Sequence, residues 1–437
     1  MKLWSLWKCR KGGSKVNYVI IGNSAAGIGT VEGIRKVDSK GRITLISDEP
    51  YHTYSRPLIS YYLGGKVKAE KMYYREQDFY EKMNVDVKLG VKVTTVDPAE
   101  KKVMLTSGEQ VKYDKLMLAT GGKPIVPEMT GSDLKGVFTF LKWDDVKAIE
   151  NYVGKKDKVV IIGAGLIGLK AAEAMVGFKA EVKVVELANR VLSAILDEEA
   201  ALIVQSKLEE QGISFYLNNT VEIIEGKDGK VTGVKLQSGE KLDCDSVIIA
   251  IGVIPNKGLA VEAGLEVNRG IIVDEHLQTS DFSIYAAGDV SEGYDTIYKQ
   301  RRVLPILPNA YKQGFAAGQN MAGEEVKYPG GFAMNAIGFF GLSMITAGII
   351  KPVGEEFVQI KDNEPERNSL RKIVLRDNKV VGYIALNDID RMGIITGLME
   401  NEVDVESFKD DLLRKDFGYV YMPKDYRLEK LLGVKKQ

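Results

Sequence analysis

Residues Tyr18–Gly27 read YVIIGNSAAG, and the rest of the chain can be interpreted outward from this stretch. Its first four residues are apolar and predict a buried strand, Gly22 and Gly27 flank a turn of small residues, and residues 25–36 predict a helix. A strand, a glycine-rich turn and a helix in this order seat the pyrophosphate of a dinucleotide, because backbone N–H groups and the positive end of the helix dipole meet at the turn. Ser24 replaces the middle glycine and weakens the match, so an ordinary tight turn is the alternative. The residues expected to contact the nucleotide are Gly22, Ser24, Ala25, Ala26 and Gly27.

A second copy of this pattern is complete. Lys158–Ile162 predicts another buried strand, and Gly163–Gly168 reads GAGLIG, a full GxGxxG that opens a helix. The next strand, Glu181–Val185, leads to Glu186, at the spacing where an acid bonds the ribose of the nucleotide. A carboxylate there repels the extra phosphate of NADP, so the motif predicts NAD. The residues expected to contact this nucleotide are Gly163, Gly165, Leu166, Ile167, Gly168 and Glu186.

Composition excludes several classes of protein. The 437 residues include 60 Lys and Arg and 60 Asp and Glu, and a formal net charge of zero argues against binding to nucleic acid or to a membrane surface. Cys9 and Cys244 are the only cysteines, which excludes a disulfide scaffold, a thiolate zinc site and a CxxC redox centre. His52 and His276 are far apart in the sequence, so no metal site is predicted. Few cysteines, no secretory signal and no apolar run of membrane-spanning length predict a cytoplasmic protein.

Two strand–glycine–helix units in one chain predict an α/β protein with a duplicated, Rossmann-like dinucleotide-binding domain and a C-terminal α+β domain. The expected boundaries at the two ends are an N-terminal arm at 1–16 and the α+β domain at 329–437. The arm contains Trp4 and Trp7 among basic residues, and it is either a disordered extension or a docking segment for a partner or membrane surface.

The segments between the two motifs give further expectations. Arg42–Ile46 predicts a second strand, and Asp48 beyond its end is the better-spaced candidate for a ribose-binding acid. Residues 66–82 are charged and aromatic and predict a helix. Residues 85–103 and 111–118 alternate apolar and polar side chains and predict an antiparallel meander that leads into a buried strand. The strand that follows it ends at Ala119, Thr120 and Gly121.

These motifs together resemble the pyridine nucleotide–disulphide oxidoreductase family, the FAD reductases with two dinucleotide-binding domains. The resemblance covers about residues 17–437. It is carried by Gly22–Gly27, Ala119–Gly121, the inner Gly163–Glu186, Ala250–Gly252, and Thr279-Ser280 followed by Tyr285–Asp289. Within the family, Tyr54–Leu58 (YSRPL) is similar to the branch of rubredoxin reductases, ferredoxin reductases and nitrite reductase flavodomains. Other branches carry a redox cysteine here, and this chain has none between Cys9 and Cys244.

The resemblance implies that the second of two Rossmann-like domains is inserted in the first. It implies FAD in the outer domain, at 17–124 and 254–328, NAD(H) in the inserted domain, at 125–253, and a C-terminal domain, at 329–437, that forms an interface. It implies that Asp289 accepts hydrogen bonds from the ribityl chain, that Arg56 approaches FAD, and that a helix near Asn309 directs its N-terminus at the flavin. The residues so implied to line the cofactor sites are Arg56, Pro57, Ala119, Thr120, Gly121, Gly252, Gly288, Asp289, Asn309 and Ala310.

Two positions depart from the relatives. Relatives often carry a Lys after the Arg-Pro pair, where this chain has Tyr61, and a Glu two residues after the last inner glycine, where this chain has Lys170. In relatives the two side chains pair beside the flavin. Lys170 is therefore the candidate catalytic residue, an ammonium near flavin N5 or the nicotinamide, and the alternative is that it points to solvent or a ribose.

The implied activity is transfer of electrons from NADH through FAD to an iron–sulphur acceptor, either a rubredoxin- or ferredoxin-like carrier or a partner subunit. The implied assembly is a homodimer or a subunit of a redox complex. A cysteine-free NADH oxidase that uses oxygen and a non-catalytic, NADH-sensing flavoprotein are the alternatives. Lys299–Arg302 (KQRR) is the densest basic cluster after the arm. It is either a steering surface for an acidic carrier, or a solvated loop, or a set of residues that contact the nucleotide or the C-terminal domain.

Overall fold

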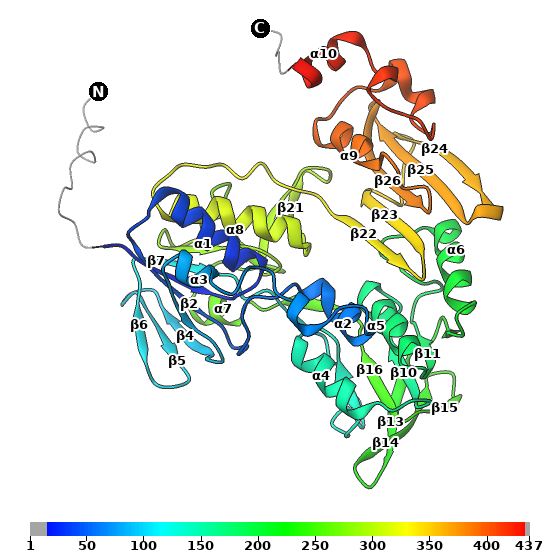
Figure 1. Ribbon diagram of the computed structural model, residues 1–437, viewed down its shortest axis with the longest axis horizontal. Helices are drawn as coiled ribbons and strands as arrows, with labels where there is room; N and C mark the ends of the chain where they lie inside the picture. Colours follow the sequence, from blue (N-terminus) through cyan, green and yellow to red (C-terminus); the bar gives the residue numbers. More distant parts are fainter. Residues whose placement is uncertain (1–14, 433–437) are drawn as a thin grey trace. The chain divides into compact units, whose positions relative to one another are not determined.

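The computed structural model describes residues 15–432, so the N-terminal arm predicted for 1–16 falls almost entirely outside the described residues. The chain divides into two compact units (Figure 1). The first unit contains residues 15–55, Tyr73–Lys123 and Ile254–Gly331, and the second contains Arg56–Met72, Pro124–Val253 and residues 332–432. The short strands β8 (Gly122–Pro124) and β17 (Val253–Pro255) lie where the chain passes from one unit to the other.

A five-stranded parallel sheet, in the order β19-β7-β1-β2-β3, forms the centre of the first unit. The strands of this unit are β1 (Asn17–Ile21), β2 (Arg42–Ile46), β3 (Val85–Lys88), β4 (Val93–Asp97), β5 (Lys102–Leu105), β6 (Gln110–Lys112), β7 (Lys115–Leu118), β18 (Ile271–Ile272), β19 (Ile284–Ala286), β20 (Ser291–Asp295) and β21 (Gln300–Val303). Its helices are α1 (Ala25–Val37), α3 (Phe79–Lys82), α7 (Gly258–Glu262) and α8 (Leu307–Met321). The central strands β1 and β7 are apolar and buried from their second residue onward, as expected for a parallel sheet that is covered on both faces.

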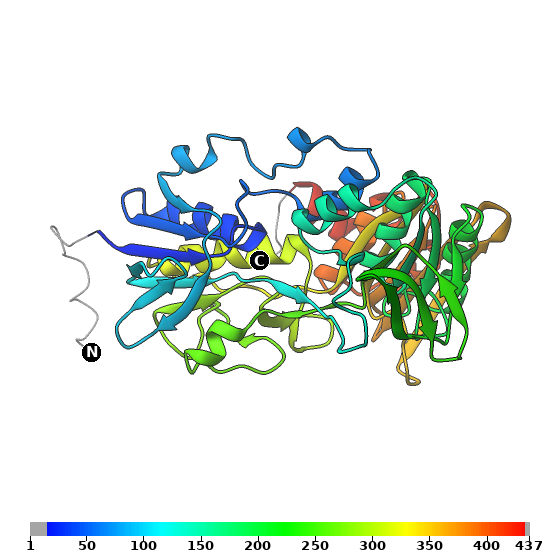
Figure 2. The same ribbon diagram turned by 90° about the horizontal axis from the view of Figure 1, so that it is seen from below.

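Helices α1 and α8 pack unusually closely against each other in this unit (Figure 2). A Cβ on Gly29 would lie 2.5 Å from the carbonyl oxygen of Tyr311, and one on Gly33 would lie 2.1 Å from that of Phe315. Reciprocally, a Cβ on Gly314 would lie 2.0 Å from the carbonyl oxygen of Ala26. Backbone therefore meets backbone along this interface, and α8, which follows the insertion in the sequence, is fixed against the helix of the first glycine motif.

The second unit repeats this architecture with the order β12-β11-β10-β16-β9, again fully parallel. Its first part contains α2 (Ile59–Leu63), β9 (Val137–Thr139), α4 (Trp143–Tyr152), β10 (Lys158–Ile162), α5 (Leu166–Gly177), β11 (Glu181–Val185), α6 (Glu198–Glu209), β12 (Ser214–Tyr216), β13 (Val221–Lys227), β14 (Lys230–Leu236), β15 (Lys241–Asp243) and β16 (Ser246–Ile249). Asp228 and Gly229 close the β13–β14 hairpin with positive φ, as the Asp-Gly pair predicts.

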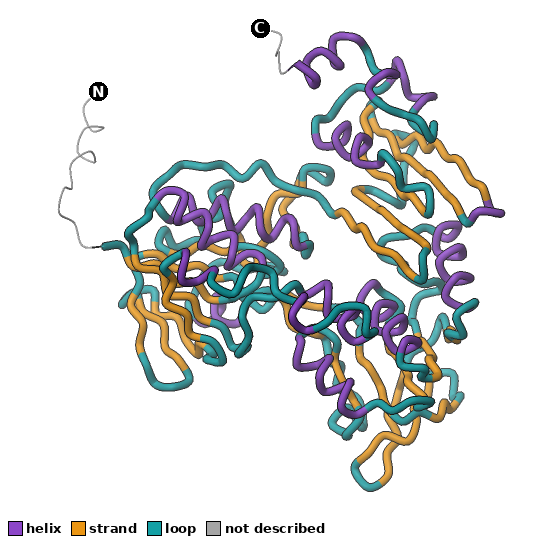
Figure 3. The backbone as a smooth tube through the Cα atoms, viewed as in Figure 1, coloured by secondary structure: helices purple, strands orange, loops and turns teal. Residues whose placement is uncertain are grey.

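An antiparallel sheet in the order β22-β23-β26-β25-β24 follows in the second unit, with α9 against β26 (Figure 3). Its elements are β22 (Met334–Phe339), β23 (Leu342–Gly348), β24 (Phe357–Glu364), β25 (Ser369–Arg376), β26 (Lys379–Leu386), α9 (Met392–Glu400) and α10 (Lys424–Leu432). Lys372 on β25 is buried between Asp197 and Glu199 at the start of α6. The C-terminal sheet is therefore ion-paired to the inserted nucleotide-binding fold.

One local prediction is wrong and a second is confirmed only in part. Residues 66–82 contain only the short turn Ala69–Lys71 and the four-residue α3 as helix, because Arg75 and its aromatic neighbours anchor an irregular segment to Glu32 of α1. The meander predicted for 85–103 and 111–118 is present as the antiparallel sheet of β4, β5 and β6. Its two ends differ, because β3 pairs in parallel with β2 and β7 pairs in parallel with β1. No helix among residues 15–432 combines the length and apolarity needed to cross a membrane, and this part of the chain contains no cluster of three His, Cys, Asp or Glu that would hold a metal.

Candidate functional site

The first glycine turn is held by backbone contacts that exclude any side chain. Gly22 has φ +121°, and a Cβ there would lie 2.1 Å from the carbonyl oxygen of Ala119. A Cβ on Gly27 would lie 2.0 Å from the carbonyl oxygen of Gly22. Glycine is therefore required at both ends of the turn, and α1 starts directly at the carboxyl end of β1.

The second turn has the same construction. Gly163 has φ +107°, and a Cβ on Gly168 would lie 2.0 Å from its carbonyl oxygen. A Cβ on Gly165 would meet no atom within 4 Å, so the middle of the turn is open, as a phosphate-binding turn requires. Ser24 in the first turn has φ −111° and Gly165 has φ −78°, so serine adopts this backbone without strain.

Glu186 lies beside the second turn. Its Oε2 accepts a hydrogen bond of 2.6 Å from the backbone N–H of Ala164, and its Oε1 accepts one of 2.8 Å from that of Ala188. The carboxylate is thus fixed at the end of β11, next to the glycines, which is where a ribose-binding acid is expected.

The first unit places its acids differently. Ile46 pairs with Ile21 in the register in which Val185 pairs with Ile162, so Ser47 occupies the position of Glu186. Asp48 is exposed one residue later, whereas Glu49 is buried and accepts a 2.5 Å hydrogen bond from Tyr54. The ribose contact of Asp48 stays a prediction.

Residues from distant parts of the first unit meet near its glycine turn. A Cβ on Gly288, which follows β19, would lie 3.1 Å from the Cβ of Ala26 and 3.4 Å from that of Ala310. Gly288 donates a 2.7 Å hydrogen bond to Gln313 of α8, and Asn309 is buried in the first turn of that helix. The structure thus brings the Gly288–Asp289 segment, the start of α1 and the start of α8 together. The contact predicted between Asp289 and the ribityl chain stays a prediction.

The turns after β7 and β16 are hydrogen-bonded in place. Thr120 Oγ1 donates to the carbonyl oxygen of Asn256 at 2.8 Å, and Gly121 accepts a 2.8 Å bond from the Asn256 N–H. In the second unit Gly252 accepts from the Ile125 N–H at 3.0 Å.

Arg56 and Pro57 form the 3₁₀ turn Arg56–Leu58, which is grouped with the second unit and not with the first glycine turn. Arg56 donates to the carbonyl oxygen of Leu141 at 3.3 Å. Their FAD contacts stay predictions.

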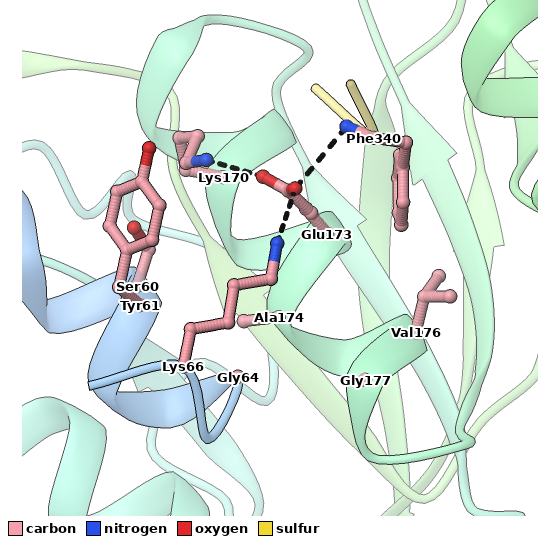
Figure 4. A pocket seen from close by; sticks show the side chains of 10 residues that line it. All are labelled: Ser60, Tyr61, Gly64, Lys66, Lys170, Glu173, Ala174, Val176, Gly177 and Phe340. Carbon is pink, nitrogen blue, oxygen red and sulfur yellow. Dashed lines mark hydrogen bonds and ion pairs between the residues drawn. The ribbon is translucent and has the colours of Figure 1, made fainter. Parts of the chain in front are cut away.

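Lys170 on α5 is buried, so the alternative in which it points to solvent is wrong. Its ammonium pairs with Glu173 one turn along the helix, donates to the carbonyl oxygen of Gly338 at 3.2 Å, and lies 4.3 Å from the ring centroid of Tyr61 (Figure 4). The other oxygen of Glu173 binds Lys66 at 2.9 Å. The side chains of Tyr61, Lys66, Lys170 and Glu173 line a pocket of about 150 Å³.

Glu173 and Lys66 were missed by sequence reasoning. The spacing of three residues between Lys170 and Glu173 is a signal for a helical ion pair, whereas nothing in the sequence indicates Lys66. Burial alone would raise the pKa of Glu173, but hydrogen bonds from Lys170 and Lys66 outweigh it and lower that pKa.

The basic cluster Lys299–Arg302 lies on and beside β21, a strand paired with β20, so it is not simply a solvated loop. Arg302 forms a 3.0 Å ion pair with the buried Asp295 and stacks on Tyr298. Arg301 is exposed, so the cluster combines a structural arginine with an exposed one. Elsewhere, burial raises the pKa of the Cys244 thiol to about 12, which removes it as a nucleophile at neutral pH.

Comparison with known proteins finds two family models along the chain. The model described as pyridine nucleotide–disulphide oxidoreductase matches residues 16–314, and the model described as rubredoxin NAD+ reductase C-terminal domain matches residues 334–403.

Among curated proteins, the chain is 32% identical over 394 residues to a nitrite reductase [NAD(P)H] of Bacillus subtilis, covering 90% of this chain and 48% of that one. The chain thus spans about half the length of that relative. It is 34% identical to a rubredoxin-NAD(+) reductase of Pseudomonas putida (71% of this chain, 81% of that one) and 37% identical to an NADH oxidase of Methanocaldococcus jannaschii (71% of each). Among solved structures, the covalent putidaredoxin reductase–putidaredoxin complex matches with a TM-score of 0.83 at 26% identity, covering 90% of this chain and 94% of that one.

Proposed function

Because the chain belongs to the pyridine nucleotide–disulphide oxidoreductase family, we propose that it takes electrons from NADH and delivers them through FAD to an iron–sulphur protein. Members of this family are flavin-dependent NAD(P)H oxidoreductases, and the two glycine turns, the second of which is open at Gly165, fit FAD and NAD(P)H as cofactors. FAD supplies the chemistry, since a flavin accepts two electrons together and releases them one at a time. Glu186 favours NADH over NADPH by charge repulsion.

The observation that carries the choice of acceptor is the antiparallel sheet that begins at β22, which matches the C-terminal domain of rubredoxin NAD+ reductases. The cysteine content supports it. Cys244 is buried with a raised pKa, and no cysteine lies between Cys9 and Cys244, so electrons cannot leave through a thiol pair there. The proposed acceptor is therefore an iron–sulphur carrier or partner subunit. The proposed enzyme is cytoplasmic and is either a homodimer or part of a complex.

The test compares three acceptors for NADH oxidation by the purified, FAD-loaded chain. Fast turnover that depends on an added rubredoxin or ferredoxin supports the proposal. Fast oxygen consumption without a carrier contradicts it and favours the NADH oxidase reading, which the relative from Methanocaldococcus jannaschii suggests. Stable reduced flavin with negligible turnover on any acceptor contradicts it in favour of a sensing flavoprotein. Co-purification with an iron–sulphur subunit, identified by mass and absorbance, would distinguish a complex from a free enzyme.

A further inference from the structure

The cluster around Lys170 contains two lysines and one carboxylate. Lys66 and Lys170 both pair with Glu173, so the three side chains together carry one net positive charge. The carboxylate is fully used, since Oε1 accepts from Lys66 at 2.9 Å and from the Phe340 N–H at 3.3 Å, and Oε2 binds Lys170. Figure 4 shows both ammonium groups directed at Glu173 from different elements.

Lys170 lies one helical turn into α5, the helix that starts at the second glycine turn. At 1.5 Å per residue, its Cα lies about 6 Å along the axis from the first residue of the helix, Leu166. Salt screens exposed charges over about 10 Å at 0.1 M and screens buried charges less, and this length exceeds the rise along the helix from Leu166 to Lys170. The charge state of Lys170 therefore bears on nucleotide affinity.

We infer that Glu173 is a positioning residue that keeps the Lys170 ammonium charged and fixed on the nucleotide-binding helix. The charged or titratable groups that the described residues place against this ammonium are Glu173 from α5 and Tyr61 from α2, with Lys66 bound through Glu173. The remaining contacts are the Gly338 carbonyl oxygen and the Phe339 ring of β22. Glu173 supplies the single negative charge among them.

The inference rests on the proposed function in so far as the chain must bind NAD(H). Glu173→Gln keeps the volume of the side chain and removes its charge, which leaves a buried ammonium without a counter-charge. Such a group releases its proton at lower pH, because burial disfavours the charged form. The affinity for NAD+ should then fall in this variant as the pH rises.

The experiment measures the dissociation constant for NAD+ by calorimetry between pH 6.5 and 9.5 on the full chain. In Glu173→Gln the constant should rise at least threefold over this range. It should stay flat in Lys170→Met and in the double variant, which have no ammonium at this position, and its rise in the parent should be smaller than in Glu173→Gln. Lys66→Met is the matched control, since it removes the exposed partner of Glu173 and should follow the parent. If the dissociation constant of Glu173→Gln varies with pH as that of the parent does, the inference is overturned, and Glu173 is only a contact to Phe340 between β22 and β23.

Two further outcomes are distinguishable. If Glu173→Gln does not fold, Glu173→Asp is measured, which retracts the carboxylate by one methylene group; a smaller slope of the same sign supports the inference, and an overlay with the parent overturns it. A parent that binds neither NAD+ nor NADH contradicts the proposed function itself. If NADH reduces the parent but the dissociation constant of Glu173→Gln for NAD+ does not change with pH, only the role of Glu173 is contradicted.

Discussion

The two nucleotide-binding folds of this chain share one plan and differ at the second turn of the helix. Aligning Gly22 with Gly163 places Gly29 opposite Lys170 and Glu32 opposite Glu173. Both glutamates accept from a cation brought by another segment, Arg75 at 2.8 Å in the first fold and Lys66 at 2.9 Å in the second.

The two folds differ in the residue that lies one turn before each glutamate, which is Gly29 in the first fold and Lys170 in the second. Gly29 is required because the backbone of α8 packs directly on it. In the second fold the same helix face holds Lys170 against the rings of Tyr61 and Phe339. The first helix is thus used for close packing, and the second has room for a buried charge, which shows that one scaffold position supplies either rigidity or electrostatics.

The largest effect should come from breaking the glycine interface. Gly29→Ala places a Cβ 2.5 Å from the Tyr311 carbonyl oxygen, and neither backbone can move far. Overpacking of this kind costs about 1–3 kcal/mol, so the thermal midpoint should fall and FAD should be lost more readily. Gly165→Ala is the control, because its Cβ meets open space and the midpoint should not change. Equal midpoints for both variants would contradict the packing argument.

Asp289→Ala tests whether the first fold binds FAD through the segment that follows β19. If Asp289 binds the ribityl chain, its loss removes a charged hydrogen bond worth about 1.5–3 kcal/mol, or roughly 10- to 150-fold in the FAD dissociation constant. Asp86→Ala, at the exposed end of the same sheet, should retain FAD. Spectra of the two purified proteins report occupancy, and full occupancy in Asp289→Ala would count against the assignment.

Glu186→Gln tests whether the second fold selects its nucleotide by charge. Glutamine still accepts from the Ala164 N–H but does not repel a phosphate. The preference for NADH over NADPH, measured as the ratio of kcat/KM values, should fall about tenfold, equivalent to about 1.4 kcal/mol. A parent that uses both nucleotides equally would show that Glu186 does not discriminate.

The smallest effect concerns the exposed arginine of β21. Arg301→Ser should slow the reduction of an acidic iron–sulphur carrier about two- to threefold at low salt, with rates that converge on the parent at high salt, as electrostatic steering requires. Arg302 is left intact because it pairs with the buried Asp295. Lys40→Ser, an exposed cation elsewhere in the first unit, is the control. Superimposable salt profiles for Arg301→Ser and the parent would remove β21 as the docking surface.

The sequence predicted what depends on local pattern. These features are the two glycine turns, the strands that precede them, and the place of Glu186 at the end of β11. Each follows from residues that are close in the sequence. Side chains that meet across the fold were not predictable in this way. Lys66 reaches Glu173 only because α2 packs on α5. Residues 85–88 join the parallel sheet because they pair with the edge of β2. The register of the first fold also places Ser47, and not Asp48, opposite Glu186.

The glycine interface between α1 and α8 has a consequence for the order in which the chain becomes structured during synthesis. The edge strand β19 and helix α8 emerge from the ribosome after the whole insertion, whereas the sheet of the inserted fold uses only residues 137–249. The inserted sheet can form first, whereas the glycine face of α1 stays uncovered until α8 has been synthesised. Such long-range closure is slow and leaves apolar surface open to aggregation. Translation speed and chaperone supply should therefore affect the yield of the first fold more than that of the second.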